Sequence, residues 1–80
     1  MSTFLLVHVH TAPECRAVFA AWTGFASPLR RQPAWASCLS GGHHVWWTVD
    51  AEGAAAALRY LPPYVARRTE AIRVHPVTIP

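Results

Sequence analysis

The sequence contains no lysine, so its net charge of +3 comes from arginine, which outnumbers the acidic residues. Charged residues make up only 14% of the 80 residues and apolar residues 52%, a balance typical of a folded domain rather than a disordered chain. Arginine doublets occur at 30–31 and 67–68, but a nucleic-acid-binding surface would need a longer basic stripe. We therefore expect no nucleic-acid partner and interpret the doublets as solvated surface, or as a local attraction for an anionic ligand.

Long hydrophobic runs are also missing. No apolar stretch approaches the roughly 20 residues that span a bilayer, and residues 1–7 lack the basic segment of a signal peptide. We therefore expect a cytoplasmic protein that makes no contact with a membrane. The length leaves room for a single domain over 1–80, with a core so small that a partner subunit is expected.

Cysteine is scarce as well. The two cysteines, Cys15 and Cys38, match the spacing of no zinc ribbon or Cys-x-x-Cys motif. We expect both to be free thiols in a reducing compartment, where they act as small core-facing hydrophobes. Covalent haem is excluded because no Cys-x-x-Cys-His occurs, and haem held by one histidine is the least favoured cofactor. Hydrolase, kinase and glycosidase chemistry is disfavoured because no Ser-His-Asp set, phosphate loop or carboxylate pair is present.

What the sequence does contain is a regular alternation of strand and helix patterns. The predicted elements are a strand over 4–10, a helix over 12–23, strands over 34–40 and 43–49, a helix over 54–61 and a strand over 70–75. Thr11 and Glu14 form a capping box at the start of the first helix, and Gly41-Gly42 predicts a hairpin turn. The order β-α-β-β-α-β predicts an α+β fold, the ferredoxin-like sandwich. Its antiparallel sheet has strand order 4-1-3-2 and carries both helices on one face.

Alternation along each strand assigns side chains to the two faces of the sheet. Leu5, Val7 and Val9 form an apolar row that we predict to face the helices, as we predict for Ile72 and Val74 in the last strand. The face without helices, here called the open face, is then predicted to carry Phe4, Leu6, His8, His10, Trp35, Leu39, His44, Trp46, Arg73 and His75. This surface is too apolar to stay in water on a small monomer. We therefore predict a homodimer through this sheet face that encloses a cavity.

The pattern resembles the dimeric α+β-barrel superfamily, whose small ferredoxin-like subunits pair through their sheets. The opening Thr3-Phe4-Leu5-Leu6-Val7 and the close Val74-His75-Pro76-Val77-Thr78-Ile79-Pro80 resemble those of small uncharacterised actinobacterial proteins of this fold. One group of those proteins includes a nickel-binding protein. The superfamily also contains cofactor-free monooxygenases, isomerases, cyclases, haem-degrading enzymes and plain binding proteins, so the resemblance does not select a function.

The first functional hypothesis is a histidine-rich metal site. His8 and His10 lie two positions apart on the predicted strand, with β-carbons roughly 6.5–7 Å apart, so both can converge on one ion. Imidazole suits nickel, copper and zinc. His44 or His75 on the neighbouring strands would supply a third ligand and leave a position open for water or substrate. This hypothesis describes a small ligand-binding protein that holds divalent Ni, Cu or Zn.

Two alternatives use the same surface. The predicted residues for binding an organic ligand are Phe4, Trp35, Trp46 and Arg73. The aromatic side chains would form an apolar wall, Arg73 would hold a carboxylate or enolate, and His8 or His10 would act as the general base. This describes a cofactor-independent isomerase, cyclase or monooxygenase acting on an aromatic or polyketide-like molecule, with His8, His10 and Arg73 as catalytic candidates. In the other alternative, the histidines only form hydrogen bonds within a dimer interface.

Overall fold

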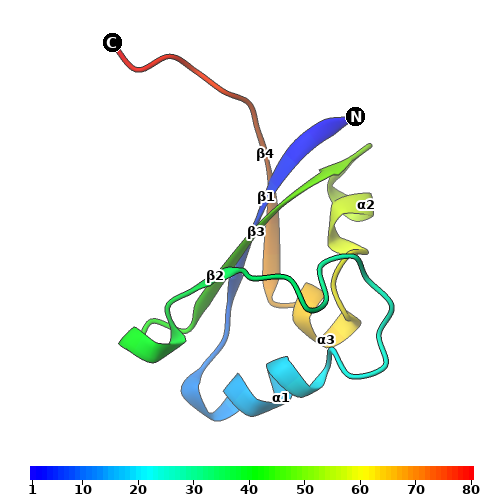
Figure 1. Ribbon diagram of the computed structural model, residues 1–80, viewed down its shortest axis with the longest axis vertical. Coiled ribbons are helices and arrows are strands. Elements are labelled where there is room, and N and C mark those ends of the chain that lie inside the picture. The colour runs from blue at the N-terminus through cyan, green and yellow to red at the C-terminus, as the bar shows by residue number, and fades with distance from the viewer.

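The computed structural model describes residues 1–80 as a four-stranded antiparallel sheet with three short α-helices packed against one face (Figure 1). The strands are β1 (Ser2–Val9), β2 (Trp35–Ala36), β3 (His44–Ala51) and β4 (Thr69–Val74). The helices are α1 (Cys15–Ala20), α2 (Ala54–Leu58) and α3 (Pro63–Ala66), with short 3-10 turns η1 (Ala12–Glu14) and η2 (Cys38–Ser40). The sheet order is β2-β3-β1-β4, which is 4-1-3-2 when it is counted from the β4 edge. The fold is therefore α+β, and no helix has the length and apolar character of a membrane span.

The turn after β1 is fixed by the capping box. The carboxylate of Glu14 accepts a hydrogen bond from the Thr11 backbone N–H at 2.8 Å, and its second oxygen accepts one from the Arg68 guanidinium at 2.9 Å. The Thr11 N–H and then the Arg68 side chain lower the pKa of Glu14 to about 2, so this carboxylate is charged at neutral pH. These bonds hold the start of the first helical segment against the end of β1 and the loop that precedes β4.

The predicted hairpin differs from the structure at its turn. Instead of a strand over 34–40, β2 has two residues, and the chain then coils through η2 before it enters β3. Ser37 organises this connection, because its carbonyl accepts from the Gly42 N–H at 2.9 Å and its hydroxyl oxygen accepts from the His44 N–H at 3.0 Å. Trp35 consequently pairs with Trp46, whereas a two-residue turn at Gly41-Gly42 would have placed it opposite Thr48. Leu39, predicted in the sheet, is fully exposed on η2.

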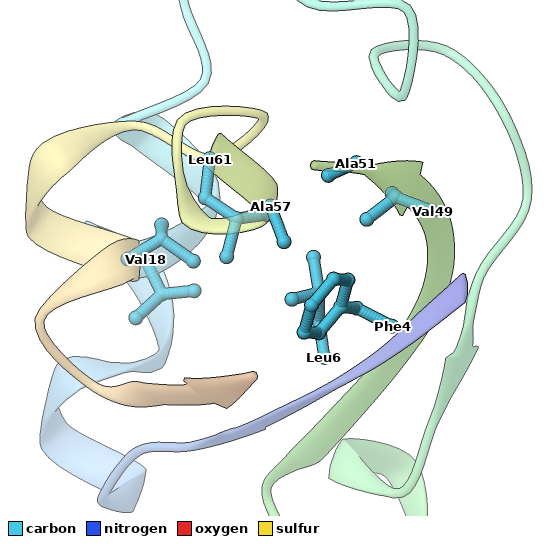
Figure 2. Packing of buried hydrophobic residues seen from close by; sticks show 8 residues of the cluster. Phe4, Leu6, Val18, Val49, Ala51, Ala57 and Leu61 are labelled. Carbon is cyan, nitrogen blue, oxygen red and sulfur yellow. The ribbon is translucent and has the colours of Figure 1, made fainter. Parts of the chain in front are cut away.

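The prediction of which face of β1 is buried is wrong. Phe4, Leu6 and His8 point toward the helices and are 3%, 0% and 0% exposed, whereas Val9 in the other row is 50% exposed. Figure 2 shows Phe4 and Leu6 directed at the helical side chains. The core cluster consists of Phe4, Leu6, Val18, Val49, Ala51, Ala57, Leu61 and Val65. The larger apolar side chains fill this interior, and His8 can join them because both of its ring nitrogens have hydrogen-bond partners.

The prediction of which β4 side chains face the helices is also wrong, because β4 pairs with β1 in a fixed register. Ile72 lies opposite Leu5 and therefore shares the open face with it, while Arg73 lies opposite Phe4 on the helical side. The Arg73 guanidinium sits 5.7 Å from the centre of the Phe4 ring. The alternation predicted for the third strand is right: Val45 and Val49 are buried beneath the helices.

Candidate metal centre

Four side chains with metal-binding atoms meet at the end of the sheet where β1 ends and β3 begins. His10 directly follows β1, Cys15 is the first residue of α1, Cys38 is the first residue of η2, and His43 directly precedes β3. We call these four residues the His/Cys cluster. Each offers one nitrogen or sulfur, and the four atoms all lie within 4.8 Å of one another. A group of this kind can hold a metal ion.

Backbone pairing brings the two halves of the cluster together. The His10 N–H donates to the His43 carbonyl at 3.1 Å, which extends the β1–β3 ladder by one step beyond the strands. The two imidazole rings then lie 5.2 Å apart between centroids. Each half adds its cysteine through a short turn: η1 leads from His10 to Cys15, and η2 leads from Cys38 toward His43.

The arrangement contains one buried polar atom without a partner. The Nδ1 atom of His43 is buried and forms no hydrogen bond. His43 also adopts a left-handed backbone with φ of 54°, which is uncommon for a residue with a side chain. An orphaned buried nitrogen is costly unless a ligand satisfies it.

A chain of hydrogen bonds determines which nitrogen of His10 faces the cluster. The Thr69 hydroxyl donates to the Val65 carbonyl at 2.7 Å, so its oxygen accepts from the Nδ1–H of His8 at 2.9 Å. The Nε2 atom of neutral His8 then accepts from the Nδ1–H of His10 at 3.0 Å. The Nε2 atom of His10 therefore carries a lone pair, and it lies 3.6 Å from the Sγ atom of Cys38.

Burial keeps these imidazoles neutral. Removal from water, together with the neighbouring His10, lowers the pKa of His8. Removal from water and the neighbouring His43 lower the pKa of His10 in the same way. Burial, and then the nearby Cys15 thiol, raise the pKa of Cys38. At neutral pH the metal-free cluster thus presents an uncharged His10 imidazole with a free lone pair, beside a protonated Cys38 thiol whose proton a bound cation would displace.

The four histidines predicted as metal ligands do not converge on one point, although His8 and His10 are hydrogen-bonded to each other. Of them, only His10 belongs to the His/Cys cluster. His8 is hydrogen-bonded to His10 and to Thr69, so neither of its ring nitrogens is free to bind a metal. His44 lies opposite Val9 on the open face, where its ring stacks on Trp46 with centroids 5.5 Å apart. His75 is exposed beyond the end of β4. The prediction that these imidazoles share the open face is therefore wrong for His8 and His10.

The residues predicted to bind an organic ligand separate into two groups. Trp35 and Trp46 line one cleft of about 390 Å³, together with Leu5, Leu29, Pro33, Ala34, Trp47 and Thr48. Phe4 and Arg73 lie on the other side of the sheet. No histidine or arginine lines the tryptophan cleft, so it lacks the acid/base group that the predicted enzyme chemistry requires. Another cleft, of about 380 Å³ beside Met1 and Tyr60, contains no histidine or cysteine either.

The sequence patterns predict only histidines as metal ligands, and neither cysteine of the cluster is among them. The spacing between Cys15 and Cys38 matches none of the metal-binding motifs in which cysteines pair with each other. A different regularity is present: His10-x4-Cys15 and Cys38-x4-His43 are two His/Cys pairs with the same separation and opposite order. Each pair straddles one short turn, so the two separations are a signal that could have identified the ligands.

No protein-family model, curated protein or solved structure matches this chain. The resemblance to dimeric α+β-barrel proteins therefore stays a prediction.

Proposed function

We propose that this protein binds a divalent transition-metal ion through His10, Cys15, Cys38 and His43, and that zinc is the preferred ion. The convergence of the four ligand atoms within 4.8 Å carries this proposal. Two thiolates with two imidazoles form a set that suits zinc in tetrahedral coordination. Nickel and copper, also considered from the sequence, are less favoured because their divalent ions prefer square-planar or tetragonal sites.

The distances support a tetrahedral ion. With Zn–S of about 2.3 Å and Zn–N of about 2.1 Å, a sulfur and a nitrogen in a tetrahedron lie about 3.6 Å apart. The Sγ atom of Cys38 and the Nε2 atom of His10 are separated by 3.6 Å. The remaining ligand atoms lie within 4.8 Å of one another and need to close by about 1.4 Å or less. A bound ion would also satisfy the orphaned Nδ1 of His43.

The proposed role of the ion is structural. Four protein ligands leave no coordination position for water or substrate, which distinguishes structural zinc sites from catalytic ones. The ion would join the connection between β1 and α1 to the connection between β2 and β3. Only 12 of the 80 residues are buried, so a metal crosslink would add substantially to the stability of a small core.

Metal analysis of protein purified without a histidine tag tests the proposal. We expect one zinc ion per chain, a higher melting temperature after zinc is added, and sulfur-to-metal charge-transfer absorption after cobalt substitution. Cys38→Ser should reduce all three. His44→Ala is the matched control, because His44 lies beside the cluster in sequence but on the open face. The proposal fails if wild-type protein holds little metal and neither zinc nor cobalt changes its melting temperature.

We further propose that a second copy of the chain covers the open face. The apolar side chains on this face are Leu5 and Val7 in β1, Trp46 in β3 and Ile72 in β4. Trp35 in β2, which pairs with Trp46, is 83% exposed. Such a contiguous apolar surface is typical of an interface.

Both cysteines are free, which supports a reducing compartment such as the cytoplasm.

A further inference from the structure

We propose that Cys15 and Cys38 form a reversible disulfide when a peroxide oxidises them, and that this modification releases the bound metal. The metal-release half rests on the proposed function. The disulfide half requires only that the two thiols meet.

The geometry brings the two sulfurs within reach of a bond. Both cysteines are free, and both are partly exposed, so a small oxidant can approach them. Their Sγ atoms lie within 4.8 Å of each other. A disulfide bond is about 2.05 Å long, so the sulfurs must approach by about 2.8 Å or less.

The chain can make this movement because Cys38 belongs to a short turn. It starts η2, which spans only Cys38–Ser40 and is followed by Gly41-Gly42 before β3 begins. Cys15, by contrast, is held at the start of α1, next to the capping box of Thr11 and Glu14. Closure therefore requires the exposed η2 turn to shift toward a fixed partner.

His10 is placed to assist the first step. In the metal-free protein its Nε2 atom is 3.6 Å from the Sγ atom of Cys38 and can relay the thiol proton to the peroxide as the sulfur attacks. The Cys38 thiolate attacks one peroxide oxygen, the O–O bond breaks, and the leaving hydroxide takes up the proton as water. The Cys15 thiolate then displaces the second oxygen, which also leaves as water after protonation. In total, two thiols and one hydrogen peroxide yield one disulfide and two water molecules.

Loss of the metal follows from the ligand set. The disulfide removes both thiolates, which leaves only the imidazoles of His10 and His43 to hold the ion. A disulfide sulfur is a poor metal ligand because the thiolate is the binding form. Reduction by a thiol or phosphine restores the two thiols and with them the site.

The experiment treats zinc-loaded and metal-free protein with hydrogen peroxide and follows released zinc with a chromophoric chelator. Because the chain has no lysine, trypsin cuts only after arginine and places Cys15 in the fragment 1–16 and Cys38 in the fragment 32–59. We expect these fragments to be linked, with a loss of two hydrogens per chain, in both samples. We also expect complete zinc release that phosphine reverses. Cys15→Ser is the control that cannot form the link.

The outcomes separate the two proposals. If zinc binds with full occupancy but peroxide produces no linked fragments, or only links between chains, the inference is overturned and the metal site stands. If the link forms while zinc remains bound, the release half is overturned. If reduced protein binds no zinc but the link forms, the proposed function fails and the disulfide half is supported.

Discussion

Replacing Thr69 by valine tests whether the hydrogen-bond chain behind His10 prepares it for a metal. Valine has nearly the same shape as threonine but lacks the hydroxyl that joins the Val65 carbonyl to the Nδ1–H of His8. His8 then loses the group that keeps its proton on Nδ1. If the proton moves to Nε2, His8 donates to His10, and His10 must carry its own proton on the atom that faces Cys38.

The expected loss is one of metal affinity as well as of stability. Removal of a group that orients a metal-bound histidine lowers affinity by about 10–100-fold, or about 1.4–2.7 kcal/mol. In the metal-free protein the His8 N–H loses its partner, and an unsatisfied buried group costs about 1–3 kcal/mol. The Val65 carbonyl keeps the Arg68 N–H as a donor and adds no such cost. The free energy of unfolding should therefore fall even without zinc.

Zinc affinity is measured by competition with a chromophoric chelator, and stability by urea unfolding in the presence of a chelator. Thr48→Val is the matched control, since Thr48 is exposed on the open face and forms no bond to the cluster. If Thr69→Val and Thr48→Val bind zinc with the same affinity as wild-type, the hydrogen-bond chain does not prepare His10, and the reasoning is refuted.

Three further outcomes are expected. Burial lowers the folded-state pKa of His8 and His10 below their ordinary value of about 6.5. As the pH falls, the unfolded chain therefore takes up protons before the folded chain does. The free energy of unfolding of the metal-free protein should be highest above about pH 6.5 and should decrease below it. A urea series from pH 8 to 5 would contradict this if stability rose on acidification. Leu6→Ala should cost about 2–5 kcal/mol because Leu6 is fully buried, while Leu39→Ala should change stability by about 0.5 kcal/mol or less. Ile72→Lys should convert a dimer to a monomer in light scattering; a wild-type monomer at micromolar concentration would disprove the second copy.

The β1 strand shows what the alternation of side chains along a strand can and cannot predict. The alternation along residues 4–10 correctly predicts that odd and even side chains face opposite ways, but it does not state which row is buried. Both rows begin with apolar residues, and the histidines at the end of one row suggested exposure. Thr69, which lies far away in the sequence, gives His8 a partner and removes the cost of burying it.

The metal centre required more than pattern recognition. His10 and His43 are far apart in the chain, and they meet because β1 pairs with β3 in one particular register. The turn η2, which the sequence pattern predicts as part of a strand, directs Cys38 toward His10. Predicted as a strand residue, Cys38 was assigned to the interior as an ordinary hydrophobe.

Local chemistry along the chain was sufficient to predict the order of the four strands and of α1 and α2, the capping box at Thr11 and Glu14, and the alternation of the third strand, but not the separate helix α3. Each of these depends on residues a few positions apart, whose preferences act on the backbone directly. Only the tertiary structure decided which face of β1 meets the helices and which cysteines meet which histidines. Burial of a polar side chain and assembly of a ligand set both depend on partners that the folded chain supplies from distant positions.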